Sequence, residues 1–261
     1  MFNFVYENMD FAHKYDEHTL PSDDFTKHMH DHYELLYVVR GDIHYTIDSQ
    51  TKRLGPGDTL LIPPGALHFG TVNPAMHYER FVLKFSSKSL HPFIMERIKK
   101  CKAFCGRISG LDKHFAELDR IYDEYCDEER YILMMAVLMR ILIQVYHTDN
   151  DQPQRDIVTN EMIAAIIKYI DANTHRQITL EDICNELHFS KSYISSEFSK
   201  EMKTPVMNYI KTKKIIAAHR MITETDMSIA DVARQFGYNE YSTFYRNYLK
   251  IIGFPPQKSK S

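Results

Sequence analysis

The chain has 261 residues, enough for two ordinary domains, and its mixture of 44% hydrophobic and 26% charged residues excludes intrinsic disorder. The formal net charge is −3, yet from residue 155 onward there are 15 Lys and Arg against 12 Asp and Glu, so the acidic excess lies in the earlier part. The C-terminal part is therefore the better candidate for binding a polyanion.

The start of the chain and its cysteines indicate the cellular compartment. The first residues, MFNFVYENMDFAHKYDEH, carry charges where a secretory signal would need an apolar core. The four cysteines lack paired C-x-x-C spacing, which predicts reduced thiols. The longest apolar run, residues 131–146, includes Arg140 and Gln144 and is too short and too polar for a comfortable membrane span. These features predict a cytoplasmic protein with no membrane partner.

The first ninety residues are rich in predicted strands. Short runs of β-branched and aromatic residues are separated by glycine and proline turns, and they cover residues 33–39, 42–48, 59–62 and 79–85. Many short strands with such turns predict a sandwich or a small barrel.

Polar side chains in this region are placed to meet inside such a barrel. His28, His30 and Glu34 share even parity, so on extended backbone they point to one face, and His68 follows the Pro-Pro-Gly turn on a later strand. If the sheet curls, three imidazoles and a carboxylate converge in its interior. These groups suit a divalent metal ion, the polar groups of an effector, or a buried hydrogen-bonded cluster.

Residues 91–147 place apolar side chains at spacings of three and four, which predicts helices. The last of these, over residues 131–146, is apolar around most of its circumference, so it packs either on the barrel or against a second subunit. The following residues 148–158 are polar, include a proline and lack periodicity, which predicts an interdomain linker.

A helix-turn-helix pattern then appears twice, at residues 180–201 and 228–251, after a predicted helix at 160–173. In the second helix of each motif, apolar residues four apart face the first helix: Ile194 with Phe198, then Phe244 with Tyr248. Ser190 and Asn239 end the two turns and are predicted N-caps. Two such motifs joined by one helix are a more specific signal than one.

The helix predicted at residues 205–222 sets the distance between the two motifs. Its length is roughly 27 Å at 1.5 Å per residue, and successive major-groove faces lie about 34 Å apart along one side of B-DNA. A rigid connector of that order can present both second helices to one face of the duplex. The duplication therefore predicts binding to double-stranded DNA.

The candidate DNA contacts lie opposite the apolar positions of these two helices. In the first, short hydroxyl side chains suggest weak base readout, with longer side chains near phosphate, and the candidates are Ser192, Tyr193, Ser195, Ser196 and Lys200. In the second, the candidates are Tyr241, Ser242, Tyr245 and Arg246. Arg246 is the one able to make a bidentate contact to guanine, so base discrimination is assigned to it.

Two sequence motifs resemble those of the cupin superfamily: His28-x-His30-x3-Glu34-x6-Gly41, and Gly57-x5-Pro63-Pro64-Gly65-x2-His68. The cupin motifs supply metal ligands, which implies a divalent metal at His28, His30, Glu34 and His68. The second motif departs from the pattern because Val72 stands at its final Asn position.

Together with the duplicated motif, the whole chain resembles the AraC/XylS-type transcription regulators, most strongly over residues 178–256, which contain SIADVARQFGYNEYSTFYRNYLKIIGFPP. The resemblance implies an α+β multidomain protein, with a cupin-like β-barrel and helices C-terminal to it, then an all-α domain whose two helix-turn-helix motifs are joined by a long helix. Lys203 stands where that family usually has glycine. The implied domains are an effector-sensing barrel at 1–90, a candidate dimerisation region at 91–147, a linker at 148–158 and the DNA-binding domain at 159–258.

The resemblance also implies the function. We expect a DNA-binding regulator and not an enzyme, an activator and a homodimer, with RNA polymerase as a further candidate partner. A sugar or related polar metabolite is the expected effector, bound at His28, His30, Glu34 and His68. Two alternatives stay open: a metal-dependent cupin enzyme fused to a DNA-binding domain, and an effector-independent regulator whose barrel only dimerises.

Overall fold

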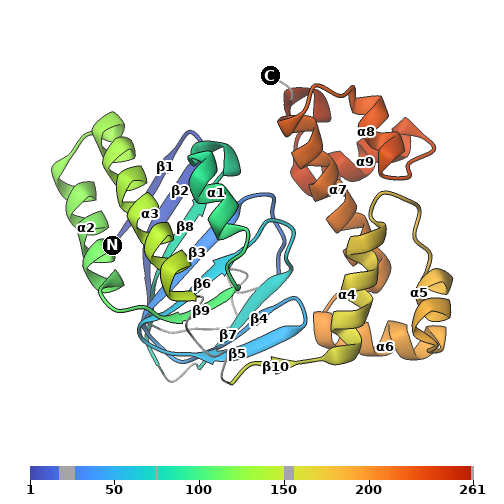
Figure 1. Cartoon of the computed structure of the whole chain (residues 1–261), viewed down its shortest axis with the longest axis horizontal. Helices are drawn as coiled ribbons and strands as arrows, with labels where there is room; N and C mark the ends of the chain where they lie inside the picture. The colour runs from blue at the N-terminus through green and yellow to red at the C-terminus, as the bar shows by residue number, and fades with distance from the viewer. Residues whose placement is uncertain (18–26, 74–75, 150–155, 260–261) are drawn as a thin grey trace.

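The computed structural model describes residues 1–17, 27–73, 76–149 and 156–259, and it places a β-barrel part beside a helical part (Figure 1). In the described chain the strands form two antiparallel sheets. The larger has the order β1 (Phe2–Tyr6), β2 (Met9–Asp16), β8 (Tyr78–Phe85), β3 (Tyr33–Arg40), β6 (Asp58–Ile62) and β9 (Phe104–Arg107). The smaller has the order β10 (Val158–Thr159), β5 (Gln50–Leu54), β4 (Ile43–Ile47) and β7 (His68–Val72).

The larger sheet is covered on both faces, which explains the continuous apolar run in β3. Leu36 and Val38 point toward the smaller sheet and form the barrel interior with residues such as Tyr45. Leu35 and Tyr37 point the other way, into a core shared with the helices that follow the barrel. Glu34 has the parity of Leu36, so the same alternation places its carboxylate inside the barrel.

The helices α1 (Pro92–Ile98), α2 (Leu111–Glu124) and α3 (Asp127–Asp149) lie against the outer face of the larger sheet. In Figure 1, α2 and α3 stand on the side of the barrel away from the helical domain. One face of α3 is core, because Met134, Leu138 and Ile141 are fully buried. Its other face leaves Ile132 and Ile143 64% and 40% exposed. Although α3 has the length and apolar composition of a membrane span, its buried face marks it as a core helix.

Several elements differ from the sequence prediction. The chain also contains β1, β2, β5 and β7 within its first ninety residues, and the region predicted as helical includes the short strand β9. β9 pairs with β6, so its conformation follows from a distant partner. The predicted linker is shorter at both ends, because α3 runs to Asp149 and Val158 already pairs with β5. Residues 150–155 of the remaining part lie outside the described residues.

The helical part consists of α4 (Glu161–Asn173), α5 (Leu180–Leu187), α6 (Lys191–Met202), α7 (Val206–Glu224), α8 (Ile229–Gln235) and α9 (Tyr241–Ile252). The start of α7 shares a core with α4, α5 and α6, in which Ile194 and Phe198 are fully buried. The end of α7 shares a second core with α8 and α9, in which Phe244 and Tyr248 are fully buried. The two helix-turn-helix motifs are therefore confirmed as two small cores assembled on one helix.

The starts of α6 and α9 test the two predicted N-caps. The Ser190 hydroxyl accepts from the Tyr193 N–H at 3.3 Å, so the predicted cap of α6 is confirmed. The predicted cap at Asn239 is wrong. The N-cap of α9 is Glu240, whose side chain makes no capping hydrogen bond within the described residues. The turn before it contains Gly237, whose φ of +75° lies in the left-handed region that favours glycine.

Candidate functional site

The helices α6 and α9 present the residues predicted to contact DNA. On α6, Ser192, Tyr193, Ser196 and Lys200 are exposed and Ser195 is half-buried. Lys200 lies 3.8 Å from the Glu197 carboxylate, an exposed ion pair that contributes little to stability and leaves the ammonium available. The face is built from short hydroxyls with one aromatic ring and one long cation.

The corresponding face of α9 carries longer side chains. Tyr241, Ser242 and Arg246 are exposed, and Tyr245 is half-buried. The Arg246 guanidinium donates one hydrogen bond of 3.4 Å to the Thr243 hydroxyl. Gln257 donates to the Tyr241 hydroxyl at 3.0 Å, which positions this ring at the start of the helix. Three of the four candidate residues on α9 are therefore long side chains, against two of five on α6.

His28, His30, Glu34 and His68 come together as strand parity predicts, with Glu34 and His68 buried, His30 half-buried and His28 exposed. One ligand atom from each lies within 4.8 Å of the other three. His28 Nε2 is 2.9 Å from His68 Nε2, and His30 Nε2 is 3.2 Å from Glu34 Oε2. The segment before β3 supplies two of the histidines, β3 supplies the carboxylate and the first residue of β7 supplies His68.

Backbone carbonyls orient two of these rings. His30 Nδ1 lies 2.9 Å from the His32 carbonyl oxygen, and His68 Nδ1 lies 3.0 Å from that of Ala66. Without a cation, His30 Nε2–H donates to the Glu34 carboxylate. If each Nδ1–H donates to its carbonyl instead, both Nε2 lone pairs point into the cluster. This is the arrangement in which a protein prepares histidines for a metal ion.

The protonation states of the cluster also suit a cation. Burial lowers the pKa of His68 to about 3 and also lowers the pKa of His30. Burial alone would raise the pKa of the Glu34 carboxyl, but the hydrogen bond with His30 and the nearby His68 lower it to about 2. Neutral imidazoles and an ionised carboxylate form the donor set that a divalent ion requires, so these residues fit such an ion.

A cavity of about 70 Å³ continues from the cluster into the barrel. Its lining includes Arg80, which is only 4% exposed and whose guanidinium lies 4.4 Å from the Tyr78 ring centroid. Tyr45 lines the same space. Sequence reasoning missed these three residues. No local signal marked Arg80, because it faces inward through the register of β8, which pairs it opposite Val38 of the barrel interior.

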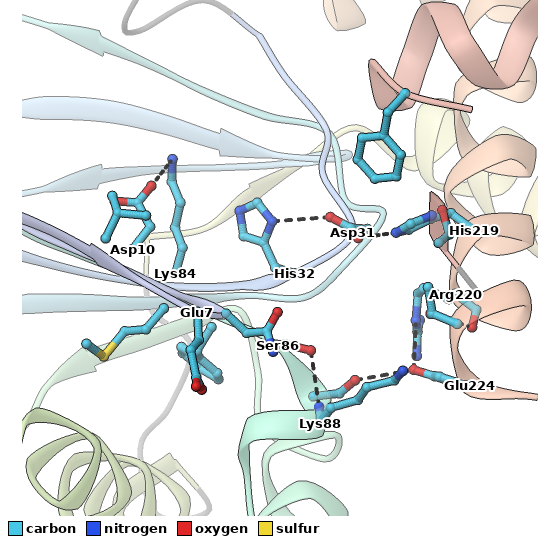
Figure 2. A pocket seen from close by; sticks show the side chains of 18 residues that line it. Glu7, Asp10, Asp31, His32, Lys84, Ser86, Lys88, His219, Arg220 and Glu224 are labelled. Carbon is cyan, nitrogen blue, oxygen red and sulfur yellow. Dashed lines mark hydrogen bonds and ion pairs between the residues drawn. The ribbon is translucent and has the colours of Figure 1, made fainter. Parts of the chain in front are cut away.

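The barrel contacts the helical domain through residues that the sequence also did not reveal. Asp31 Oδ2 lies 2.9 Å from His219 Nε2 on α7, at one side of an interdomain cleft of about 520 Å³ (Figure 2). Hydrogen bonds with His219 and His32 hold the pKa of Asp31 well below its usual range. A second contact joins the Asp48 carboxylate to the Tyr209 hydroxyl at 3.0 Å. The barrel therefore packs along α7.

Comparisons with known proteins agree with this architecture. A family model described as an AraC-like ligand binding domain matches residues 14–141, and one described as a helix-turn-helix domain matches residues 183–260. A solved structure of a probable AraC family transcriptional regulator from Rhodopseudomonas palustris CGA009 is 22% identical, with a TM-score of 0.36, over 39% of this chain and 95% of that one.

Two relatives align with most of the chain. The HTH-type transcriptional regulator YdiP of Escherichia coli (strain K12) is 27% identical over 241 residues, which span 88% of this chain and 78% of that protein. The lactose operon transcription activator of Staphylococcus xylosus is 27% identical over 232 residues, which span 83% of this chain and 79% of that protein. The chain therefore belongs to the AraC-type transcription regulators, with an N-terminal ligand-binding domain and a C-terminal helix-turn-helix domain, and it is not an enzyme.

Proposed function

We propose that this regulator is a sequence-specific activator that inserts α6 and α9 into successive major grooves. The main support is that both helices are exposed on one face, that each packs on its own hydrophobic core, and that both cores include residues of α7. The 19 residues of α7 span about 28 Å at 1.5 Å per residue. That length suits grooves that recur about every 34 Å along one side of the duplex.

In this proposal α6 and α9 make different kinds of contact with DNA. Arg246 reads a guanine through a bidentate contact, with Tyr241, Ser242 and Tyr245 beside it. On α6 the serines lie over the bases with short reach, whereas Tyr193 and Lys200 contact phosphates. Most of the sequence discrimination therefore comes from α9, and α6 mainly positions the protein. The serines concerned are Ser192, Ser195 and Ser196.

Selection from a randomised duplex pool, followed by gel shifts on single-base variants, tests this division. We expect Arg246→Ala to cost about 1–3 kcal/mol at one base position and little elsewhere. The matched control is Lys250→Ala, an exposed cation on the same helix, which should weaken binding to all duplexes alike. A uniform, sequence-blind loss with Arg246→Ala would show that its role is misassigned.

The effector we propose is a sugar or related polar metabolite bound at His28, His30, Glu34 and His68. The similarity to a lactose operon activator supports a sugar. The adjoining cavity of about 70 Å³ has room for roughly two waters at about 30 Å³ each, so a sugar ring must displace neighbouring side chains. A divalent metal ion needs no such displacement. It is the second candidate, favoured by the four potential ligand atoms that lie within 4.8 Å of one another.

A thermal-shift assay on the full chain separates these effectors. Sugars and Zn²⁺ or Mn²⁺ are added singly, and a ligand at a hundred times its Kd should stabilise the fold by about 2.7 kcal/mol. The shift should disappear in His68→Ala and persist in His44→Ala, which changes an exposed histidine of β4. If no compound shifts the wild type, the alternative of an effector-independent barrel gains support.

We also propose that the protein is a cytoplasmic homodimer whose subunits meet through the exposed face of α3. Ile132 and Ile143 lie eleven residues apart, about three helical turns, on the face that the barrel does not cover. Such apolar side chains on an otherwise polar surface favour burial against a second copy. RNA polymerase is the further partner that an activator requires.

A further inference from the structure

Two short segments of the barrel pair with each other beside the histidine cluster. We refer to residues 28–31 and 65–68 as the paired segments. His28 and His68 exchange two backbone hydrogen bonds of 3.0 Å, and the Gly65 N–H donates to the His30 carbonyl at 2.9 Å. The paired segments therefore move as a small ladder rather than as independent loops.

The two faces of this ladder serve different parts of the molecule. His28, His30 and His68 point to the effector site. The alternate residues Met29 and Leu67 pack instead on the core formed by α4, α5, α6 and the start of α7. Because successive side chains on extended backbone point to opposite faces, each of these three histidines is bonded directly to a residue, Met29 or Leu67, that contacts the helical domain.

One contact of the outer face reaches the first helix-turn-helix motif. Leu67 is buried in the same core as Ile194 and Phe198 of α6. The Asp48 carboxylate accepts from both the Leu67 N–H and the Tyr209 hydroxyl at 3.0 Å. Leu67 is therefore held to α7 by a polar contact as well as by packing.

The other contact reaches the second motif. Asp31 pairs with His219 at 2.9 Å, as Figure 2 shows, and the opposite nitrogen of that ring bonds to the Tyr248 hydroxyl on α9. If His219 Nε2–H donates to Asp31, Nδ1 is left to accept from Tyr248. The Tyr248 oxygen in turn lies 2.7 Å from the Ser259 hydroxyl. A continuous chain of hydrogen bonds thus runs from the segment that carries His30 to the helix that carries Arg246.

We propose that the paired segments couple the effector site to both helix-turn-helix motifs, through Leu67 to the first and through Asp31 and His219 to the second. The inference rests on the proposed effector site. A ligand that draws the three histidines together shifts Met29, Asp31 and Leu67 on the opposite face, since neighbouring residues share one backbone. Densely packed contacts convert such small shifts into a change of domain arrangement.

Amide hydrogen exchange on the full chain tests the coupling without any effector. In His219→Asn, which alters only the helical domain, we expect peptides covering residues 27–32 and 63–68 to exchange at least five times faster than in the wild type. Asp31→Asn should reproduce the effect from the barrel side. The matched control is His175→Asn, an exposed histidine of the helical domain, which should leave those peptides unchanged. Unchanged exchange in His219→Asn and Asp31→Asn would overturn the proposal.

Cobalt titration then measures the same coupling through the Kd for Co²⁺ at the histidine cluster. Co²⁺ bound to the cluster is followed by its absorbance, and His68→Ala should abolish the signal. Because coupling is reciprocal, His219→Asn should change the Kd for Co²⁺ at least five-fold, whereas His175→Asn should not. Equal Kd values in His219→Asn and the wild type would contradict the coupling. A wild-type chain that takes up no Co²⁺ counts against the proposed site, and the exchange result alone then decides the coupling.

Discussion

The turn of the second helix-turn-helix motif offers a sharp test of how the two motifs are joined. Gly237 has a φ of +75°, and a Cβ built on it would lie 2.7 Å from the Gln177 nitrogen and 2.8 Å from the Arg176 carbonyl carbon. Both neighbouring atoms are backbone, so they cannot rotate away. Gly237→Ala should therefore force the segment before the first motif away from the turn of the second.

The cost has two parts. Placing an L-residue in the left-handed region costs about 1–2 kcal/mol, and overpacking against fixed atoms costs about 1–3 kcal/mol more. Gly253→Ala is the matched control, because its φ is +91° but nothing described lies within 4 Å of its built Cβ. It carries the conformational cost alone, partly offset by about 0.4–1 kcal/mol from the loss of glycine's freedom in the unfolded chain.

Urea unfolding of the full chain, followed by far-ultraviolet circular dichroism, measures both variants. Gly237→Ala should lose about 2–4 kcal/mol of unfolding free energy, well beyond the loss in Gly253→Ala. Equal losses in the two variants would refute the close packing between the motifs. Backbone strain at the positive φ would then account for both losses.

Three further predictions follow from single residues. Lys203 ends α6 with a φ of +51°, so Lys203→Gly should raise the free energy of unfolding by about 0.5–1 kcal/mol, and an unchanged urea midpoint would argue against this. The buried Lys214 ammonium donates to the Phe236 carbonyl at 2.9 Å and also to the Arg176 carbonyl. Lys214→Met leaves both carbonyls without this donor, so it should lower the free energy of unfolding by about 2–4 kcal/mol. Urea unfolding measures the loss, with Lys211→Met at a half-buried position as the control. Ile143→Glu should shift sedimentation toward monomer with little loss of stability, and an unaffected dimer would place the subunit contact elsewhere.

Much of the helical domain could be predicted because its signals are local. Ile194 and Phe198 lie four apart, as do Phe244 and Tyr248, and a helix places such pairs on one face whatever surrounds it. The Ser190 cap likewise depends on groups three residues away. The Asn239 prediction was wrong because several residues of a turn can precede a helix, and α9 begins one residue later, with Glu240 as its N-cap.

Less of the barrel could be predicted, because its strands pair with partners that are distant in the chain. Strand parity was enough to place His28, His30 and Glu34 on one face, since alternation is a property of extended backbone. It could not show that β9 completes the sheet, because that strand forms only against its partner β6. Nor could it show that Arg80 enters the cavity, which depends on the register of β8 against β3.

Local patterns were enough to predict the two helix-turn-helix cores, the candidate DNA-contacting side chains and the polar cluster of the barrel. Tertiary contacts define how these parts meet: the barrel packs against α7, Asp31 pairs with His219, and α3 has one buried and one exposed face. The difference follows from how far apart the interacting residues lie along the chain. Periodicity and capping act between near neighbours in the chain, whereas contacts between domains depend on residues that only folding brings together.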